Sequence, residues 1–399
     1  MPDLLKSIPP GVGYALAITF GAQLVMALPV TGASVLAPLV APALGLPPSM
    51  LGVYMAVLWS GATLASMASG ALLARIAPVR ALQLCLLAVA LGALLTASGN
   101  LWLMVAGAVL LGLGAGPEVP ASVQLLTRVT TSGNRGLVFA AKHTGWTFGS
   151  VIVGALGPAL SVALGWQGCV IAFGAACALA FLAIEPGRRR FDPGHVAFVP
   201  PRGAVFESLR AIARSAPLRR ITIVAVVLTV AFNAYMGFLV SLLVVELGYT
   251  LALAGTIFSI GNLGAIVGRL GCGSIAGRWI EPGKLLLAIG YGMALLAAVV
   301  GLATAEWPIV AVAVASVLLG MVGGGWLGVC LAEIARLAPP DQVGLVTGGV
   351  LVFHYLTIIV APLSFAAIAA GFGYGWGFLS VAAITALGLL PMLLPARRA

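Results

Sequence analysis

Residues 101–126 read LWLMVAGAVLLGLGAGPEVPASVQLL, an apolar run in which Glu118 is the only charged side chain. A helix that crosses a membrane needs about 20 mostly apolar residues. Pro117 and Pro120 do not exclude a helix here, because helices in lipid tolerate proline better than helices in water do. The run therefore predicts a membrane-spanning helix with one acidic side chain near its middle.

The rest of the chain repeats this pattern. Of its 399 residues, 61% are hydrophobic and only 8% are charged. So few charges could not cover the surface of a soluble enzyme, and so high a hydrophobicity excludes a disordered chain. We predict twelve membrane-spanning helices, at about 11–39, 48–74, 79–99, 101–126, 136–163, 166–185, 219–245, 250–276, 283–303, 307–333, 344–370 and 374–394.

One connection is much longer than the others, and it divides the spans into six and six. Residues 186–218 carry six arginines and lack a long apolar run. The predicted fold is all-α and integral to the membrane, with two pseudo-symmetric six-helix bundles. Its parts are an N-terminal bundle at 1–185, a cytoplasmic linker loop at 186–218 and a C-terminal bundle at 219–399.

The positions of the basic residues predict the orientation, since cytoplasmic loops carry an excess of Lys and Arg. With the N-terminus in the cytoplasm, all of the 20 basic residues except Lys142 and Arg269 lie at the cytoplasmic side. The net charge of +10 therefore reflects topology and attraction to an anionic leaflet, not nucleic-acid binding. We expect a multi-pass protein of a bacterial-type inner membrane, with both termini cytoplasmic and no cleavable signal peptide.

The two halves also share a spacing of residues. In each half a glycine is followed 16 residues later by an arginine and 24 residues later by a second glycine, as Gly112, Arg128 and Gly136 and as Gly320, Arg336 and Gly344. Both triplets mark the end of one span, a short cytoplasmic turn and the start of the next span. A duplicated six-span unit predicts a transporter fold with a substrate site between its halves, near mid-membrane.

The loops after the second and eighth spans match each other too. One runs from Gly70 through Ala74-Arg75 to Arg80, and the other from Gly273 through Gly277-Arg278 to Lys284. With these loops the chain resembles the major facilitator superfamily over nearly its whole length. That family carries G-x-x-x-D-R-x-G-R-[KR] after its second span and a weaker copy after its eighth. Ala74 and Gly277 stand where the family has the acid.

The resemblance implies a gate of charged residues at the cytoplasmic side. Its members here would be Arg75, Arg278, Glu333 and Arg336, with Arg278 as the partner of Glu333. The segment Gly154-Ala-Leu-Gly157-Pro158 resembles part of a proline–glycine motif of antiporters, and close helix packing with a bend explains the same residues equally well.

Ionisable side chains inside the membrane are costly, so each is a candidate for function. Arg269 lies nine residues before Arg278, roughly 13 Å above the cytoplasmic face, and a guanidinium binds a carboxylate with two parallel bonds. The resemblance supports this role, since nitrate, monocarboxylate and oxalate transporters of the superfamily carry an anion-binding arginine at this position. Lys142 and Glu118 lie at similar depth on consecutive spans, where an ion pair between them is either structural or opens on substrate binding.

Further candidates are a set of polar and aromatic side chains. Glu118, His354 and His143 are candidates for proton coupling, since histidine titrates near physiological pH. Lys142 and Trp146 share a helix face, whereas His143 is rotated by about 100° from Lys142. The candidate substrate-binding residues are Arg269, Lys142, Asn233, Tyr235, Tyr54 and Trp146.

The balance of embedded charges favours an anionic substrate, since Arg269 and Lys142 outnumber Glu118. We expect a proton-coupled secondary transporter that moves a small organic anion, most simply a carboxylate, across the inner membrane by alternating access. The alternative is a proton-driven efflux antiporter for drugs or metabolites that uses Glu118.

Other classes of function have little support in the sequence. It shows no nucleophile–base pair, metal cluster or Walker-type loop, so we expect neither an enzyme nor an ATP-driven pump. The five cysteines lie in apolar runs without metal-ligand spacing, and we expect no metal and no cofactor. The expected partners are the anion, protons and the lipid bilayer, with the chain functional as a monomer.

Overall fold

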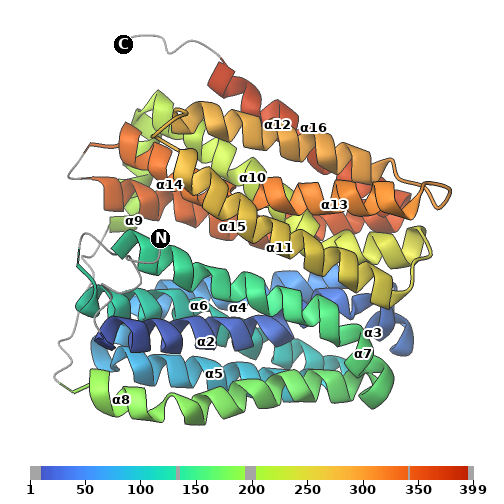
Figure 1. Ribbon diagram of the computed structural model, residues 1–399, viewed down its shortest axis with the longest axis horizontal. Coiled ribbons are helices and arrows are strands. Elements are labelled where there is room, and N and C mark those ends of the chain that lie inside the picture. Colours follow the sequence, from blue (N-terminus) through green and yellow to red (C-terminus); the bar gives the residue numbers. More distant parts are fainter. Residues whose placement is uncertain (1–9, 132–134, 194–203, 340–341, 394–399) are drawn as a thin grey trace. The chain divides into compact units, whose positions relative to one another are not determined.

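The computed structural model describes residues 10–131, 135–193, 204–339 and 342–393, and these residues are almost entirely helical (Figure 1). Long apolar sequences form helices in lipid, because a helix satisfies the hydrogen bonds of its own main-chain N–H and C=O groups. The first half forms α2 (Pro10–Val35), α3 (Ala37–Ala43), α4 (Met50–Arg75), α5 (Pro78–Thr96), α6 (Leu101–Val129), α7 (Arg135–Ala183) and α8 (Glu185–Phe191).

The second half repeats the long helices and adds a short π-helical turn. Its elements are α9 (Ala204–Arg214), α10 (Ala216–Ser241), η1 (Leu242–Glu246), α11 (Leu251–Ile275), α12 (Pro282–Gly301), α13 (Ile309–Gly324), α14 (Trp326–Leu337), α15 (Val343–Phe372) and α16 (Tyr374–Leu393). Ala276 and Ile280 form an isolated bridge within the turn that follows α11.

Eleven helical segments of the described residues are long and apolar enough to cross a membrane. One of them contains two predicted spans, because α7 is interrupted at Gly165, where φ is 71° and ψ is 167°. This left-handed conformation is open to glycine at no steric cost, so the chain turns back there. With α7 counted as two helices, the described residues hold the twelve spans that the sequence predicts.

Helix contacts group the chain into two units. Unit 1 comprises Met1–Leu36 and Val57–Pro200, and α2 packs along α7 while α5 packs along α6. Unit 2 comprises Ala37–Ala56 and Pro201–Ala399, and its main contacts join α11 to α13 and α12 to α16. The division into two six-helix bundles at the central loop stays a prediction.

Glycines set how closely α11 and α13 approach each other in unit 2. A Cβ on Gly268 would overlap the carbonyl of Met321, and a Cβ on Gly324 would overlap the main chain of Ala265. Small residues at helix interfaces in membranes let two backbones come together and gain van der Waals contact. This contact fixes the height of Arg269, which follows Gly268 in α11.

We expect Gly268→Ala to lower the thermal stability of the protein, because the new Cβ has no room beside Met321. Overpacking costs about 1–3 kcal/mol, which outweighs the roughly 1 kcal/mol by which alanine is the better helix former. Gly271→Ala is the matched control on the same helix, since nothing lies within 4 Å of its added Cβ. Equal unfolding temperatures of the two variants in detergent would contradict this expectation.

Candidate functional site

A buried ion pair joins α6 and α7 in unit 1. Lys142 Nζ lies 2.9 Å from one carboxylate oxygen of Glu118 and donates to the other at 3.1 Å. The lysine side chain is 1% exposed and the glutamate 2%. The structure thus brings together the two charges that the sequence places at similar depth on consecutive spans. Charges this deeply buried must be paired or hydrogen-bonded, because transfer of an isolated charge out of water is very costly.

Two polar side chains complete the surroundings of the pair. Ser122 Oγ, one turn after Glu118, donates to its carboxylate at 2.7 Å. The Gln23 amide of α2, in the orientation that satisfies both of its ends, accepts from Lys142 Nζ at 3.3 Å and donates to the Lys142 main-chain oxygen at 2.6 Å. Each charge therefore has a neutral partner besides the opposite charge, and the cluster is Gln23, Glu118, Ser122 and Lys142.

Glycines beside each charged residue let its helix pack closely on a neighbour. On α6, a Cβ at Gly116 would overlap the main chain of Ala62 in α4. On α7, a Cβ at Gly145 would lie 2.7 Å from the Phe20 carbonyl of α2. The close packing of α7 on α2 also places Gln23 of α2 beside Lys142.

Arg269 in unit 2 lies at a break in the tenth predicted span. The helix stops at Gly324 and restarts at Trp326, with Gly325 between α13 and α14. Arg269 Nε donates to the Gly324 carbonyl at 3.3 Å. A helix end leaves carbonyls without helical partners, and a guanidinium is a suitable donor for one of them. The side chain is half-buried.

His354 on α15 belongs to a second polar cluster of unit 2. Its Nδ1 lies 2.9 Å from Thr229 Oγ1 of α10, and Asn233 Nδ2 donates to the Thr229 main-chain oxygen at 2.9 Å. The His354 ring lies 6.1 Å from the Trp326 ring, measured between centroids. Thr229 thus joins two residues that the sequence analysis selects separately, and all of these groups lie within unit 2.

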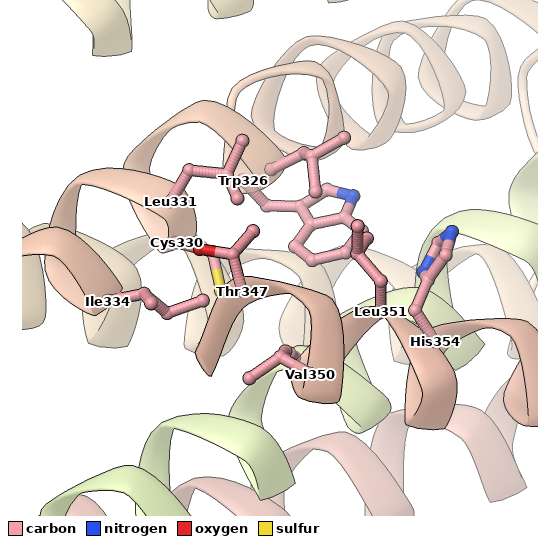
Figure 2. Close-up of a pocket in the computed structure, with 10 residues that line it drawn as sticks. Trp326, Cys330, Leu331, Ile334, Thr347, Val350, Leu351 and His354 are labelled. Carbon is pink, nitrogen blue, oxygen red and sulfur yellow. The ribbon is translucent and has the colours of Figure 1, made fainter. Parts of the chain in front are cut away.

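A small pocket opens beside His354 between α14 and α15. Figure 2 shows Trp326, Cys330 and Leu331 of α14 on one side, with Val350 and His354 of α15 on the other. Its lining also includes Ala225, Leu327, Ile334, Thr347 and Leu351. Seven of the ten lining residues are Ala, Val, Leu, Ile or Trp, so the walls are mostly apolar. His354 is the one lining residue with a titratable nitrogen.

The other predicted binding residues lie at several places. Trp146 of α7 packs against Trp59 of α4, with 6.3 Å between ring centroids. Tyr235 is fully buried between Phe232 and Phe258, and its hydroxyl faces Gly261 and Gly320. Tyr54 and His143 are partly exposed. A role of each in binding or coupling stays a prediction.

The charged residues at the predicted cytoplasmic side pair differently from the expectation. Glu333 is 2% exposed and accepts two bonds from Arg336, at 2.7 and 2.8 Å, whereas Arg278 lies over the Trp279 ring. Arg336 also contacts Glu281 at 3.0 Å. The predicted Arg278–Glu333 pair is therefore wrong in this structure. Arg336 lies three residues after Glu333 on the same helix, a spacing at which helical side chains meet, and it occupies the carboxylate. Arg75 is exposed in the last turn of α4.

We expect Arg336→Ala to destabilise the protein more than Arg278→Ala. The first change leaves the buried Glu333 carboxylate without its bidentate partner, at a cost of about 1–3 kcal/mol, reduced by the partial exposure of Arg336. The second removes only a cation from an exposed ring, since Trp279 is 76% exposed. Unfolding temperatures in detergent measure both, and a larger loss for Arg278→Ala would contradict the pairing seen here.

Sequence reasoning did not select two members of these clusters, Ser122 and Thr229. Ser122 lies four residues after Glu118, a spacing at which helical side chains meet, so it was open to prediction. Thr229 lies far from His354 in the sequence, and no local pattern marks it. Within the described residues, no group of three or more His, Cys, Asp or Glu side chains is placed to hold a metal ion.

Long apolar helices are typical of a polytopic membrane protein, and the few charges buried in them are candidates for its function. The chain belongs to the Major Facilitator Superfamily, whose family model matches residues 19–335. It is therefore a secondary transporter that works by alternating access, not an enzyme. Among curated protein sequences, none matches the chain.

Several solved structures share the fold at low sequence identity. A bacterial homologue of the human lysosomal transporter Spinster, inward-facing and unoccupied, is 13% identical with a TM-score of 0.76, covering 96% of each chain. A D-xylose–proton symporter is 13% identical with a TM-score of 0.77, covering 96% of this chain and 97% of its own. A POT family transporter in complex with 5-aminolevulinic acid is 11% identical with a TM-score of 0.77, covering 96% and 95%.

Proposed function

We propose that the protein is a proton-coupled transporter of a small organic anion, most simply a carboxylate. The observation that carries the proposal is the set of charged side chains inside the described apolar helices, which are Lys142, Glu118 and Arg269. Glu118 neutralises Lys142 within unit 1, whereas Arg269 of unit 2 donates to a neutral carbonyl, and its positive charge in a low-dielectric region attracts an anion. The proposed location is a bacterial-type inner membrane, with cytoplasmic termini and a functional monomer.

In this proposal Arg269 binds the carboxylate. Its Nε donates to the neutral Gly324 carbonyl at 3.3 Å, at the long end of the range for such a bond. A carboxylate is a stronger acceptor than a carbonyl, and it matches the two parallel donors of a guanidinium. Exchange of the carbonyl for a substrate carboxylate would therefore be favourable.

The Glu118–Lys142 pair carries the coupling. Protonation of Glu118 removes its attraction for Lys142, which leaves the ammonium group available to an anion. Ser122 and Gln23 remain as neutral partners for the two groups in that state, so neither is left without a hydrogen bond. His354 and His143 are the alternative proton carriers.

The comparisons supply support of a general kind. One structure with this fold is a proton symporter and another holds 5-aminolevulinic acid, and both properties belong to those proteins. The second candidate function is proton-driven efflux of a drug or metabolite. The observation that favours it is the buried Glu118 itself. A cationic substrate would compete with Lys142 for this carboxylate.

The experiment uses the purified protein in liposomes that contain a pH-sensitive dye. A panel of small mono- and dicarboxylates is added outside. Liposomes that contain the dye but no protein are the reference for passive entry of the acids. Acidification faster than this reference supports proton-coupled import of an anion. A response to no acid, together with proton movement driven by a cationic drug, would overturn the proposal in favour of efflux.

A further inference from the structure

We propose that unit 1 binds one anionic phospholipid on its outer surface, where α5 packs beside the part of α7 that follows Gly165 (Figure 1). The phosphate of the lipid binds the guanidinium groups of Arg80 and Arg189, and an acyl chain lies along exposed leucines of the two helices. Binding of this lipid does not depend on which substrate the protein transports. The leaflet involved is the one on the side of Arg80, which is the cytoplasmic leaflet in the proposed orientation.

The exposed face of α5 matches the thickness of one leaflet. Its leucines are 36–56% exposed and recur every three or four residues, as Leu84, Leu87, Leu91 and Leu94. Arg80 is also exposed and precedes Leu84 by one turn, so it lies at the end of this face. Leu91 follows Arg80 by 11 residues, roughly 17 Å along the axis, and half of a hydrocarbon core of about 30 Å is about 15 Å. An acyl chain that begins at Arg80 therefore meets apolar side chains along its length.

Two contacts show that α5 and this part of α7 run antiparallel. Gln83 Nε2 of α5 donates to the Phe181 carbonyl of α7 at 3.2 Å. Further along α5, Ala93 lies beside Gly174, where an added Cβ would be 2.9 Å from the Ala93 Cβ. The contact positions thus rise along α5 while they fall along α7. The beginning of α5 consequently lies beside the end of α7, where α8 follows.

The exposed sides of the two helices form one surface. Leu84 follows Gln83 and Leu182 follows Phe181, so on each helix an exposed leucine is rotated by about 100° from the contact. Equal rotations on antiparallel helices place both leucines on the same side of the pair. Helical hydrogen bonds continue from α7 into α8. Arg189, which is 77% exposed, follows Leu182 by about two turns and therefore lies on the same side.

Hydrogen bonds through Gln83 and Glu185 hold the two arginines close to each other. Arg80 Nη1 donates to Gln83 Oε1 at 3.2 Å, and Gln83 Nε2 donates to Glu185 Oε2 at 3.0 Å. Arg189 Nε lies 3.6 Å from the other oxygen of Glu185. One phosphate group between Arg80 and Arg189 can thus reach both guanidinium groups, each of which offers it parallel donors.

The charges around this position favour an anion. The start of α5 and α8 together carry four arginines and two carboxylates, listed as Arg80, Arg188, Arg189, Arg190, Glu185 and Asp192. Glu185 is shared, because Arg188 also contacts it at 2.7 Å. Asp192 accepts from the main-chain N–H groups of Val79 and Arg80, at 3.0 and 2.9 Å, which holds its oxygens at the start of α5. Basic clusters at the ends of membrane spans attract anionic headgroups, and this one has two positive charges in excess.

The test is native mass spectrometry of the delipidated protein in detergent, which resolves bound lipids by their mass. Phosphatidylglycerol is compared with phosphatidylcholine of the same acyl chains. We expect the first phosphatidylglycerol to bind about 10- to 30-fold more tightly, since each arginine contributes about fivefold. The double variant Arg80→Gln with Arg189→Gln should reduce this ratio to about threefold or less. Both side chains are exposed, so the variant should fold like the wild type.

The matched control is the double variant Arg210→Gln with Arg214→Gln, which removes the same charge from exposed positions of α9. It should keep the wild-type ratio. Inorganic phosphate should leave the bound phosphatidylglycerol in place, because it has no acyl chain to occupy the leucine face. Displacement by phosphate would overturn the inference in favour of a site for the free ion. Equal affinities for the two lipids, or a wild-type ratio in the variant that lacks Arg80 and Arg189, would also overturn it.

Discussion

Glu118→Gln is expected to slow substrate-driven acidification by at least about 100-fold, because an amide cannot accept or release the coupling proton. The change also leaves the Lys142 ammonium, 1% exposed, without an anionic partner. Loss of one member of a buried pair costs about 3–5 kcal/mol, so the single variant is also expected to unfold at a lower temperature. Dye-loaded liposomes and thermal unfolding in detergent measure the two effects.

The double variant Glu118→Gln with Lys142→Gln separates coupling from stability. Replacement of a whole buried ion pair by neutral groups is often close to neutral for stability, so the double variant should unfold near the wild-type temperature. It should still move no protons. Glu306→Gln, at an exposed position, is the matched control with wild-type behaviour. Wild-type acidification by the double variant would show that the pair is only structural.

Arg269→Ala is expected to raise the substrate concentration for half-maximal uptake by about 10²- to 10³-fold. The estimate follows from the loss of two charge-assisted hydrogen bonds, each worth about 1.5–3 kcal/mol, with part of the loss recovered by water. Arg269→Lys keeps the charge but not the planar pair of donors, and it should restore uptake only in part. Uptake of a labelled carboxylate by liposomes measures both variants.

Arg214→Ala is the control for Arg269→Ala, since it removes an exposed arginine from α9. Thermal unfolding checks that the variant keeps the stability of the wild type after the loss of the Arg269–Gly324 hydrogen bond. A variant that folds like the wild type and takes up carboxylates with unchanged half-saturation would remove Arg269 from the anion site. The excess of cations would then have no assigned role.

The spans could be predicted from the sequence because hydropathy and length alone specify a helix in lipid. The turn at Gly165 was also predictable, since the apolar run from 136 to 185 is too long for one crossing. The break at Gly325 was not, because Gly323, Gly324 and Gly325 lie inside one continuous apolar run. Which glycine ends the helix depends on the close packing of α13 against α11 and on the Arg269 hydrogen bond, both tertiary contacts.

The buried pair of unit 1 was predictable for a related reason. Glu118 and Lys142 lie on consecutive helices at similar distances along the chain from the turn between them, so their depths could be compared directly. The partner of Glu333 was harder to predict, because Arg336 on the same helix and Arg278 after α11 were both candidates. In the structure Glu333 pairs with Arg336. Rotation about the helix axis decides such choices, and an uncertainty of one residue in a boundary changes that rotation by about 100°.

The break at Gly325 has a mechanical consequence for the gate residues. α14 has 12 residues and is therefore about 18 Å long, a stiff rod with a pivot at one end and Arg336 near the other. A swing of about 10° at the pivot displaces the far end by about 3 Å. A displacement of that size would break the 3.0 Å contact between Arg336 and Glu281, the residue before α12, whereas the bond to Glu333 lies within α14 and would move with it. A small angular change at Gly325 would thus break a single contact at the far end of the short helix.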